Sequence, residues 1–102
     1  KWLAKHYIKK YTIQDDLVVN VHETVYVNGH TMTELPIQFG HIAGSFCVSG
    51  GQLETLVGCP HTVVGNFDVR GNKLTSLDYM PNNIAESIHI GGNKIISFKS
   101  NN

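Results

Sequence analysis

Apolar residues recur along this chain at a constant interval of 21 positions. Six columns of four residues keep this interval: Val21, Ile42, Val63 and Ile84; Val25, Phe46, Phe67 and Ile88; Val27, Val48, Val69 and Ile90; Gly29, Gly50, Gly71 and Gly92; Met32, Leu53, Leu74 and Ile95; and Leu35, Leu56, Leu77 and Phe98. Self-similarity at a fixed period of this length indicates a repeat architecture, in which stacked units share one core. The repeats divide the chain into four copies, 16–36, 37–57, 58–78 and 79–99.

Each copy contains a short segment in which apolar residues alternate with other residues, the period of a strand with one buried face. The segments are 25–27, 46–48, 67–69 and 88–90, and a glycine that can turn the chain follows two residues after each of them. Asn72 and Asn93 lie in this turn and are suited to bonding neighbouring backbone groups. We therefore expect a mainly β chain, a short parallel-β solenoid of about four coils with one strand per coil, about 4.8 Å apart.

The residues ahead of the first copy are expected to cap the solenoid. A short helix is predicted there, with one apolar stripe formed by Leu3, Ala4, Tyr7, Ile8 and Tyr11. A β-turn at Asp15-Asp16 between two short strands would then lead into the first coil. We assign 1–15 to the N-terminal cap helix and lead-in strand and 16–102 to the solenoid, within one structural domain. Only a few residues follow Phe98, so we expect the last coil to lack a dedicated cap.

Two copies resemble the leucine-rich repeat, whose pattern is L-x-x-L-x-L-x-x-N-x-L-x-x-L. The matching stretches are Val64-x-x-Phe67-x-Val69-x-x-Asn72-x-Leu74-x-x-Leu77 and Ala85-x-x-Ile88-x-Ile90-x-x-Asn93-x-Ile95-x-x-Phe98. The segment 72–81 is similar to the short bacterial type, and the region 11–40 resembles small proteins of tailed bacteriophages. The resemblance implies a leucine-rich-repeat solenoid and an accessory protein that binds and modulates a host protein. His30 and Gly51 stand at the asparagine position in the other copies and depart from the pattern.

The chain carries 8 basic and 8 acidic residues and has a formal net charge of zero. A neutral chain lacks the general positive field that nonspecific binding to nucleic acid or anionic membranes requires, so we expect neither partner. No apolar run reaches the roughly 20 residues of a membrane span, and two cysteines are too few for a disulfide scaffold, so we expect a cytoplasmic location. A basic stripe of Lys1, Lys5 and Lys9 on the predicted helix is the exception. We favour its interpretation as a solvated helix face, and the alternative is a local contact with nucleic acid or an acidic protein.

Stacking at this period also predicts which side chains become neighbours on the outer face of the sheet. One row reads Tyr26, Cys47, Asp68 and His89. A thiol and an imidazole in one row suggest catalysis, but strands about 4.8 Å apart place Asp68 between Cys47 and His89 and separate that pair by nearly 10 Å. A Cys–His pair needs direct hydrogen-bond reach, and three ligands on a flat face do not converge on a zinc ion. We therefore expect no enzyme activity, no metal and no cofactor.

Two interpretations remain open for Cys59, which precedes Pro60 and His61. It is either a small buried residue of the turn, which we favour, or a reactive thiol beside an imidazole. The six histidines show no metal-binding spacing, so we expect them to be scattered over the surface.

The function that we expect is a non-enzymatic protein–protein interaction module. The predicted partner-binding residues are the large or charged members of the sheet face, Tyr26, Cys47, Asp68, Arg70 and His89. The alternative is a structural or assembly component that self-associates as a homo-oligomer through its uncapped C-terminal edge.

Overall fold

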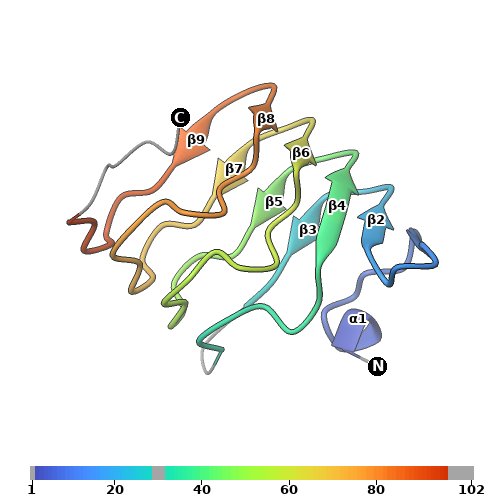
Figure 1. Ribbon diagram of the computed structural model, residues 1–102, viewed down its shortest axis with the longest axis horizontal. Coiled ribbons are helices and arrows are strands. Elements are labelled where there is room, and N and C mark those ends of the chain that lie inside the picture. The colour runs from blue at the N-terminus through green and yellow to red at the C-terminus, as the bar shows by residue number, and fades with distance from the viewer. Residues whose placement is uncertain (1, 29–31, 97–102) are drawn as a thin grey trace.

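The chain folds as a solenoid whose coils are stacked side by side from the N-terminal to the C-terminal end (Figure 1). The computed structural model describes residues 2–28 and 32–96. Strands make up 25% of the described residues and helix 4%, and the parallel sheets wind through about three turns of a β-solenoid. The predicted fold class is therefore confirmed. Some residues on which the sequence analysis drew lie outside the described ranges, namely Lys1, Gly29, His30 and Phe98.

Each coil contributes two short strands, one to each of two sheets. Sheet A has the order β1 (Tyr11–Ile13), β2 (Val19–Val21), β4 (Phe39–Ile42), β6 (Thr62–Val63) and β8 (Asn83–Ile84). Sheet B has the order β3 (Val25–Tyr26), β5 (Phe46–Cys47), β7 (Phe67–Asp68) and β9 (Ile88–His89). Neighbouring strands are parallel except β1 and β2, which form an antiparallel pair. The prediction of one strand per coil is therefore wrong, because the column that begins at Val21 forms a second row of strands.

A tight corner separates the two strands of a coil and brings successive coils close together. A Cβ atom at Gly44 would lie 2.7 Å from the backbone nitrogen of Thr24, and one at Gly65 would lie 3.0 Å from that of Ser45. The hydroxyl groups of Thr24 and Ser45 accept hydrogen bonds from the backbone N–H groups of Ser45 and Asn66, at 3.1 and 2.9 Å. A side chain larger than hydrogen does not fit at the two glycines, so these corners allow successive coils to approach each other closely.

The core lies between the two sheets and contains a column of aromatic rings. Phe46 pairs with Phe67 in the strand register, and their rings are stacked 6.1 Å apart at an angle of 9°. Phe39 packs edge-on against Phe46 at 5.2 Å, and Trp2 of the N-terminal helix lies 6.1 Å from Phe39. The stack therefore links the cap, sheet A and sheet B through contacts between large apolar side chains.

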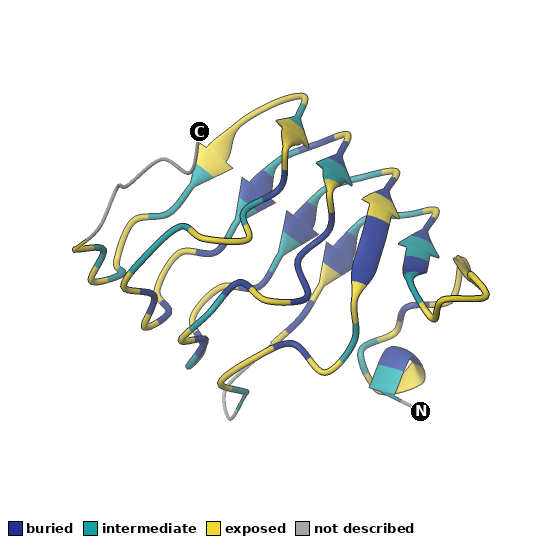
Figure 2. Ribbon diagram, viewed as in Figure 1, coloured by how far each residue is buried: buried dark blue, intermediate teal, exposed yellow. Residues whose placement is uncertain are grey.

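Burial decreases toward the C-terminal coil, where the ribbon changes from buried to exposed (Figure 2). Phe46 and Phe67 are fully buried, whereas Ile88, in the same column, is 49% exposed. The core column thus continues into the last coil without full cover from the described residues.

The N-terminal helix is shorter than the helix that the apolar stripe predicted. α1 spans Trp2–Lys5, and the Ile8 N–H group donates a hydrogen bond to the Leu3 carbonyl at 2.9 Å, while Tyr7 adopts a φ of 61°. This is the Schellman arrangement, which ends a helix with a left-handed residue and a contact between the flanking apolar side chains. Leu3 and Ile8 are buried as predicted, but Tyr7 is 82% exposed and Tyr11 belongs to β1. No helix in the described part of the chain could cross a membrane.

The first position of the leucine-rich pattern lies outside the core. Val64 is 46% exposed and Ala85 is also exposed, whereas Val63 is buried. The core position of sheet A therefore precedes, by one residue, the position that the resemblance implies.

Candidate functional site

The outer face of sheet B carries the row of side chains that the period predicted. In the register, Tyr26 pairs with Cys47, Cys47 with Asp68, and Asp68 with His89. Tyr26 is 71% exposed, and the other three are half-buried. Because each strand holds its residue by backbone bonds to the next coil, the row is a fixed series of side chains on a rigid surface. Asp68 separates Cys47 from His89, so the structure does not bring this thiol and this imidazole together.

An ion pair between Asp68 and Arg70 lies at the centre of this face. The Arg70 Nε–H group donates to Asp68 Oδ1 at 3.0 Å, and Nη2 donates to Oδ2 at 2.8 Å. The Arg70 backbone N–H group also donates to Asp68 Oδ1, at 3.1 Å. The hydrogen bonds from the guanidinium, followed by the backbone bond, hold the pKa of Asp68 below its usual range. This two-point pairing fixes both side chains, and the guanidinium remains more than half exposed.

The two thiols of the chain are poor nucleophiles. Burial raises the pKa of Cys47, the neighbouring Asp68 carboxylate raises it further, and Arg70 opposes that increase. Cys59 is buried, and desolvation raises its pKa to about 12. Since the thiolate is the reactive form, both sulfur atoms are largely protonated at neutral pH. The structure therefore supports the buried interpretation of Cys59.

The charges of Asp68 and Arg70 should control the reactivity of Cys47. We expect Asp68→Asn to accelerate the alkylation of Cys47 severalfold, because it removes a negative charge that disfavours the thiolate, and Arg70→Gln to slow it. Mass spectrometry after timed exposure to iodoacetamide at mildly alkaline pH measures both rates. Cys59 serves as the internal control, since it should stay unmodified in the folded protein. Equal rates in both variants and the wild type would contradict the electrostatic coupling.

One end of the face is hollowed. A shallow depression of about 360 Å³ is lined by Tyr26, Val27, Asn28, Cys47, Ser49 and Gly50. The exposed ring of Tyr26 and the half-buried thiol of Cys47 therefore border a surface that can receive a side chain of a partner. Amphipathic tyrosines beside such hollows are common anchors of protein interfaces.

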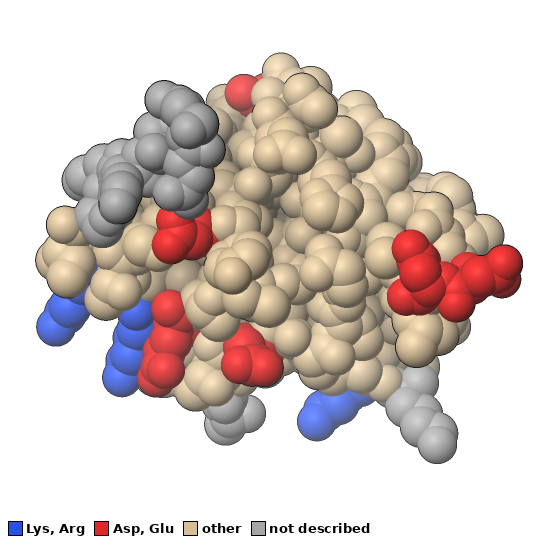
Figure 3. Space-filling model, viewed as in Figure 1, with Lys and Arg blue, Asp and Glu red and all other residues tan. Residues whose placement is uncertain are grey.

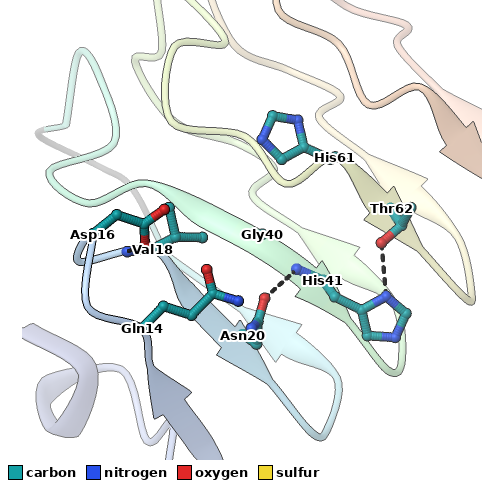
Figure 4. A pocket seen from close by; sticks show the side chains of 8 residues that line it. All are labelled: Gln14, Asp16, Val18, Asn20, Gly40, His41, His61 and Thr62. Atoms are coloured by element: carbon teal, nitrogen blue, oxygen red, sulfur yellow. Dashed lines mark hydrogen bonds between the residues drawn. The ribbon is translucent and has the colours of Figure 1, made fainter.

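Sheet A carries a second group of polar residues, which the sequence analysis did not single out (Figure 4). They line a depression of about 320 Å³, formed by Gln14, Asp16, Val18, Asn20, Gly40, His41, His61 and Thr62. The Asn20 Oδ1 atom accepts a hydrogen bond from the His41 backbone N–H group at 2.8 Å, and His41 Nδ1 lies 2.7 Å from Thr62 Oγ1. The repeat also contains a polar row directly before the apolar column of sheet A, formed by Asn20, His41, Thr62 and Asn83. This row was the signal in the sequence from which the polar group could have been predicted.

This second depression offers hydrogen-bonding groups on an open part of the surface, where His41 is exposed. The bond between His41 and Thr62 joins neighbouring coils of sheet A, and so does the bond that Asn20 accepts from the His41 backbone N–H group. We therefore assign these residues to stabilising the sheet and to polar contacts at its surface.

The predicted basic stripe does not lie on one helical face. α1 ends at Lys5, and Lys9 follows in the loop, where Glu23 Oε2 accepts hydrogen bonds from the backbone N–H groups of Lys9 and Lys10 at 2.8 and 2.9 Å. The bond from Lys10, followed by that from Lys9, lowers the pKa of Glu23. The side chains of Lys5 and Lys9 are exposed.

No group of three or more His, Cys, Asp or Glu side chains is placed to hold a metal ion within the ranges 2–28 and 32–96. The chain matches no protein family model, and neither a curated protein nor a solved structure is significantly similar to it.

Proposed function

We propose that this chain is a non-enzymatic protein-binding module that engages its partner with the outer face of sheet B. The observation that carries the proposal is the row Tyr26, Cys47, Asp68 and His89, together with the ion pair that Arg70 forms with Asp68. A mixture of one exposed aromatic ring and one pre-organised ion pair on a rigid sheet is typical of protein recognition surfaces.

The size of the face limits the interface. Four strands about 4.8 Å apart give a row about 15 Å long, so the buried area belongs to the lower end of the range for specific complexes. The affinity must then come from a few strong contacts, and Tyr26 is the principal candidate because its ring is 71% exposed. The ion pair would contribute orientation, since Arg70 already has its side chain fixed.

The partner that we propose is a protein of a bacterial host, and the location is the host cytoplasm. The support is the resemblance of the repeats to short leucine-rich repeats and to small proteins of tailed bacteriophages. An accessory protein of this kind would modulate its target by occupying a surface rather than by chemistry.

The test is an affinity capture from host lysate with matched variants of the two sheets. The triple variant Tyr26→Ala, Asp68→Ala and Arg70→Ala should lose the partner that the wild type recovers. The control, His41→Ala, Thr62→Ala and Asn83→Ala, changes the outer row of sheet A and should keep it. With the recovered partner purified, Tyr26→Ala alone should weaken binding about thirtyfold, the effect of a tyrosine hot spot worth about 2 kcal/mol. Recovery of the same proteins by the sheet B variant would refute the assignment of the site.

A second candidate function is self-association through the C-terminal edge. The exposure of Ile88, at 49% in an otherwise fully buried column, favours it, because apolar edges invite pairing with another chain. In this function the protein would be an assembly component, and Ile88→Lys should abolish its oligomers.

A further inference from the structure

The strand β1 forms the N-terminal edge of sheet A, and the described chain leaves its outer side uncovered. Sheet A ends at β1, which pairs only with β2 among the described strands. All three residues of β1 are exposed, including Ile13 at 54% and Tyr11 at 38%. The hairpin lies at the end of the molecule opposite to β8 and β9. Figure 2 shows an exposed loop at that end, beside β2. An exposed edge strand is a template for pairing with another strand.

The direction of the backbone groups along β1 follows from its pairing with β2. The Lys10 carbonyl accepts a hydrogen bond from the His22 N–H group at 2.6 Å, and the Gln14 N–H group donates to the Val18 carbonyl at 2.9 Å. Backbone groups of alternate residues point to opposite sides of an antiparallel strand. The N–H and C=O groups of Tyr11 and Ile13 therefore point away from β2, toward the free edge.

The charges that flank β1 differ in sign at its two ends. Lys9 and Lys10 precede the strand, and Asp15 and Asp16 follow it; all four are exposed. Figure 3 shows acidic atoms gathered at the end of the molecule that the hairpin forms. A strand that is basic at one end and acidic at the other is electrostatically complementary to an antiparallel copy of itself.

We propose that the free edge of β1 pairs with β1 of a second copy of this chain. The two strands would run antiparallel about a two-fold axis at Thr12, so that the backbone of Tyr11 forms hydrogen bonds with that of the partner's Ile13, and the reverse. The same register brings Lys9 next to the partner's Asp15 at both ends of the pair. Sheet A then continues from one copy into the other, and the interface is isologous and closed.

The outward backbone groups, the charges at the two ends and the side chains of β1 all favour pairing with a second copy, and they agree on one register. The outward backbone groups allow only pairings between Tyr11 and Ile13, between two Tyr11, or between two Ile13. Only the first uses all four outward groups of each strand in hydrogen bonds and sets Lys9 of each copy beside Asp15 of the other. It also creates two aromatic–β-branched pairs, which are favourable cross-strand neighbours. Leu17, in the adjoining turn, has an unfavourable left-handed backbone conformation, with a φ of 68°. Its large apolar side chain is nevertheless not buried, because the residue is 73% exposed.

Charge reversal at positions 9 and 15 tests the register directly. Sedimentation equilibrium over a range of concentrations should show a monomer–dimer equilibrium for the wild type. Lys9→Glu alone or Asp15→Lys alone should raise the dissociation constant about tenfold, because each sets like charges together at both ends of the pair. The double variant should regain the affinity of the wild type. Lys9 precedes β1 and Asp15 follows it in the turn, so the two residues lie beyond opposite ends of the strand Tyr11–Ile13, and recovery in the double variant indicates a contact between two chains.

Mixing the two single variants gives a result that only this interface predicts. The mixed dimer of Lys9→Glu with Asp15→Lys has opposite charges at both ends, so it should form although each variant alone is mainly monomeric. Native mass spectrometry distinguishes the three species by mass. Failure of the mixture to form a heterodimer would overturn the proposal.

A cysteine at the two-fold axis locates the contact independently of charge. In a background with Cys47→Ser, Thr12→Cys should form an intermolecular disulfide on mild oxidation, since facing residues of a non-hydrogen-bonded antiparallel pair have the Cα separation that a disulfide needs. Thr75→Cys, exposed on a distant loop, should not.

Ile88→Lys discriminates between the two edges. It should leave the dimer unchanged if β1 is the interface. A monomeric wild type, or a dimer that only Ile88→Lys dissociates, would refute pairing through β1, and neither outcome would affect the binding test of sheet B.

Discussion

Phe46→Ala is expected to destabilise the protein by about 3–5 kcal/mol, the usual cost of removing a fully buried aromatic ring. Phe46 has no exposed surface and contacts the rings of both Phe39 and Phe67. Its removal leaves a cavity at the point where sheet A and sheet B share the core, and the stacked coils cannot collapse to fill it without shifting their strand register. Since a domain of this size has a stability of only about 5–15 kcal/mol, the loss is a large fraction of the total. Urea unfolding followed by circular dichroism measures it.

Ile88→Ala is the matched control, because it occupies the same column one coil after Phe67. Its side chain is 49% exposed, so its removal should cost about 1 kcal/mol, in proportion to the smaller apolar area withdrawn from water. Equal losses from the two substitutions would contradict the decrease in burial toward the C-terminal coil.

The arrangement of the repeats could be predicted from the sequence because a single spacing determines it. Once residues 21 positions apart are neighbours, the pairing of Cys47 with Asp68 and of Asp68 with His89 follows, and the structure shows both pairs. The same argument separated Cys47 from His89. A parallel stack of coils converts sequence distance into spatial distance without reference to the rest of the fold.

The features that the sequence did not predict depend on interactions that the 21-residue period does not determine. In the two middle coils the chain turns between its strands at Gly44 and Gly65, where a Cβ atom would meet the backbone of the preceding coil. The helix ends early because Tyr7 adopts a left-handed backbone conformation. Glycine is the usual residue at such a helix end, so a tyrosine in the sequence does not predict that the helix stops there. The depression on sheet A combines the hairpin with the coils, and its polar residues become neighbours only when β2 joins β4.

Asn72→Ala should destabilise the protein by about 2–4 kcal/mol, although it removes little apolar surface. Asn72 is 5% exposed, and its Nδ2 atom donates hydrogen bonds to the carbonyl groups of Val48, at 2.7 Å, and Val69, at 2.9 Å. Its Oδ1 atom accepts a hydrogen bond from the Leu53 N–H group at 3.2 Å. One side chain therefore joins its own coil to the preceding one. Alanine leaves the Val48 carbonyl and the Leu53 N–H group without these partners, and burying each such group costs about 1–3 kcal/mol.

Asn93→Ala provides the comparison, since Asn93 repeats the same bonds one coil later. It donates to the Val69 carbonyl at 2.9 Å and accepts from the Leu74 N–H group at 3.1 Å, but it is only half-buried. Water can reach the groups that its removal exposes, so the loss should be about 1 kcal/mol. Urea unfolding of both variants gives the difference, and amide hydrogen exchange should accelerate at Leu53 in Asn72→Ala and at Leu74 in Asn93→Ala. Equal destabilisation by both substitutions would show that the bonds, and not their burial, set the cost, because the two asparagines differ mainly in their exposure to solvent.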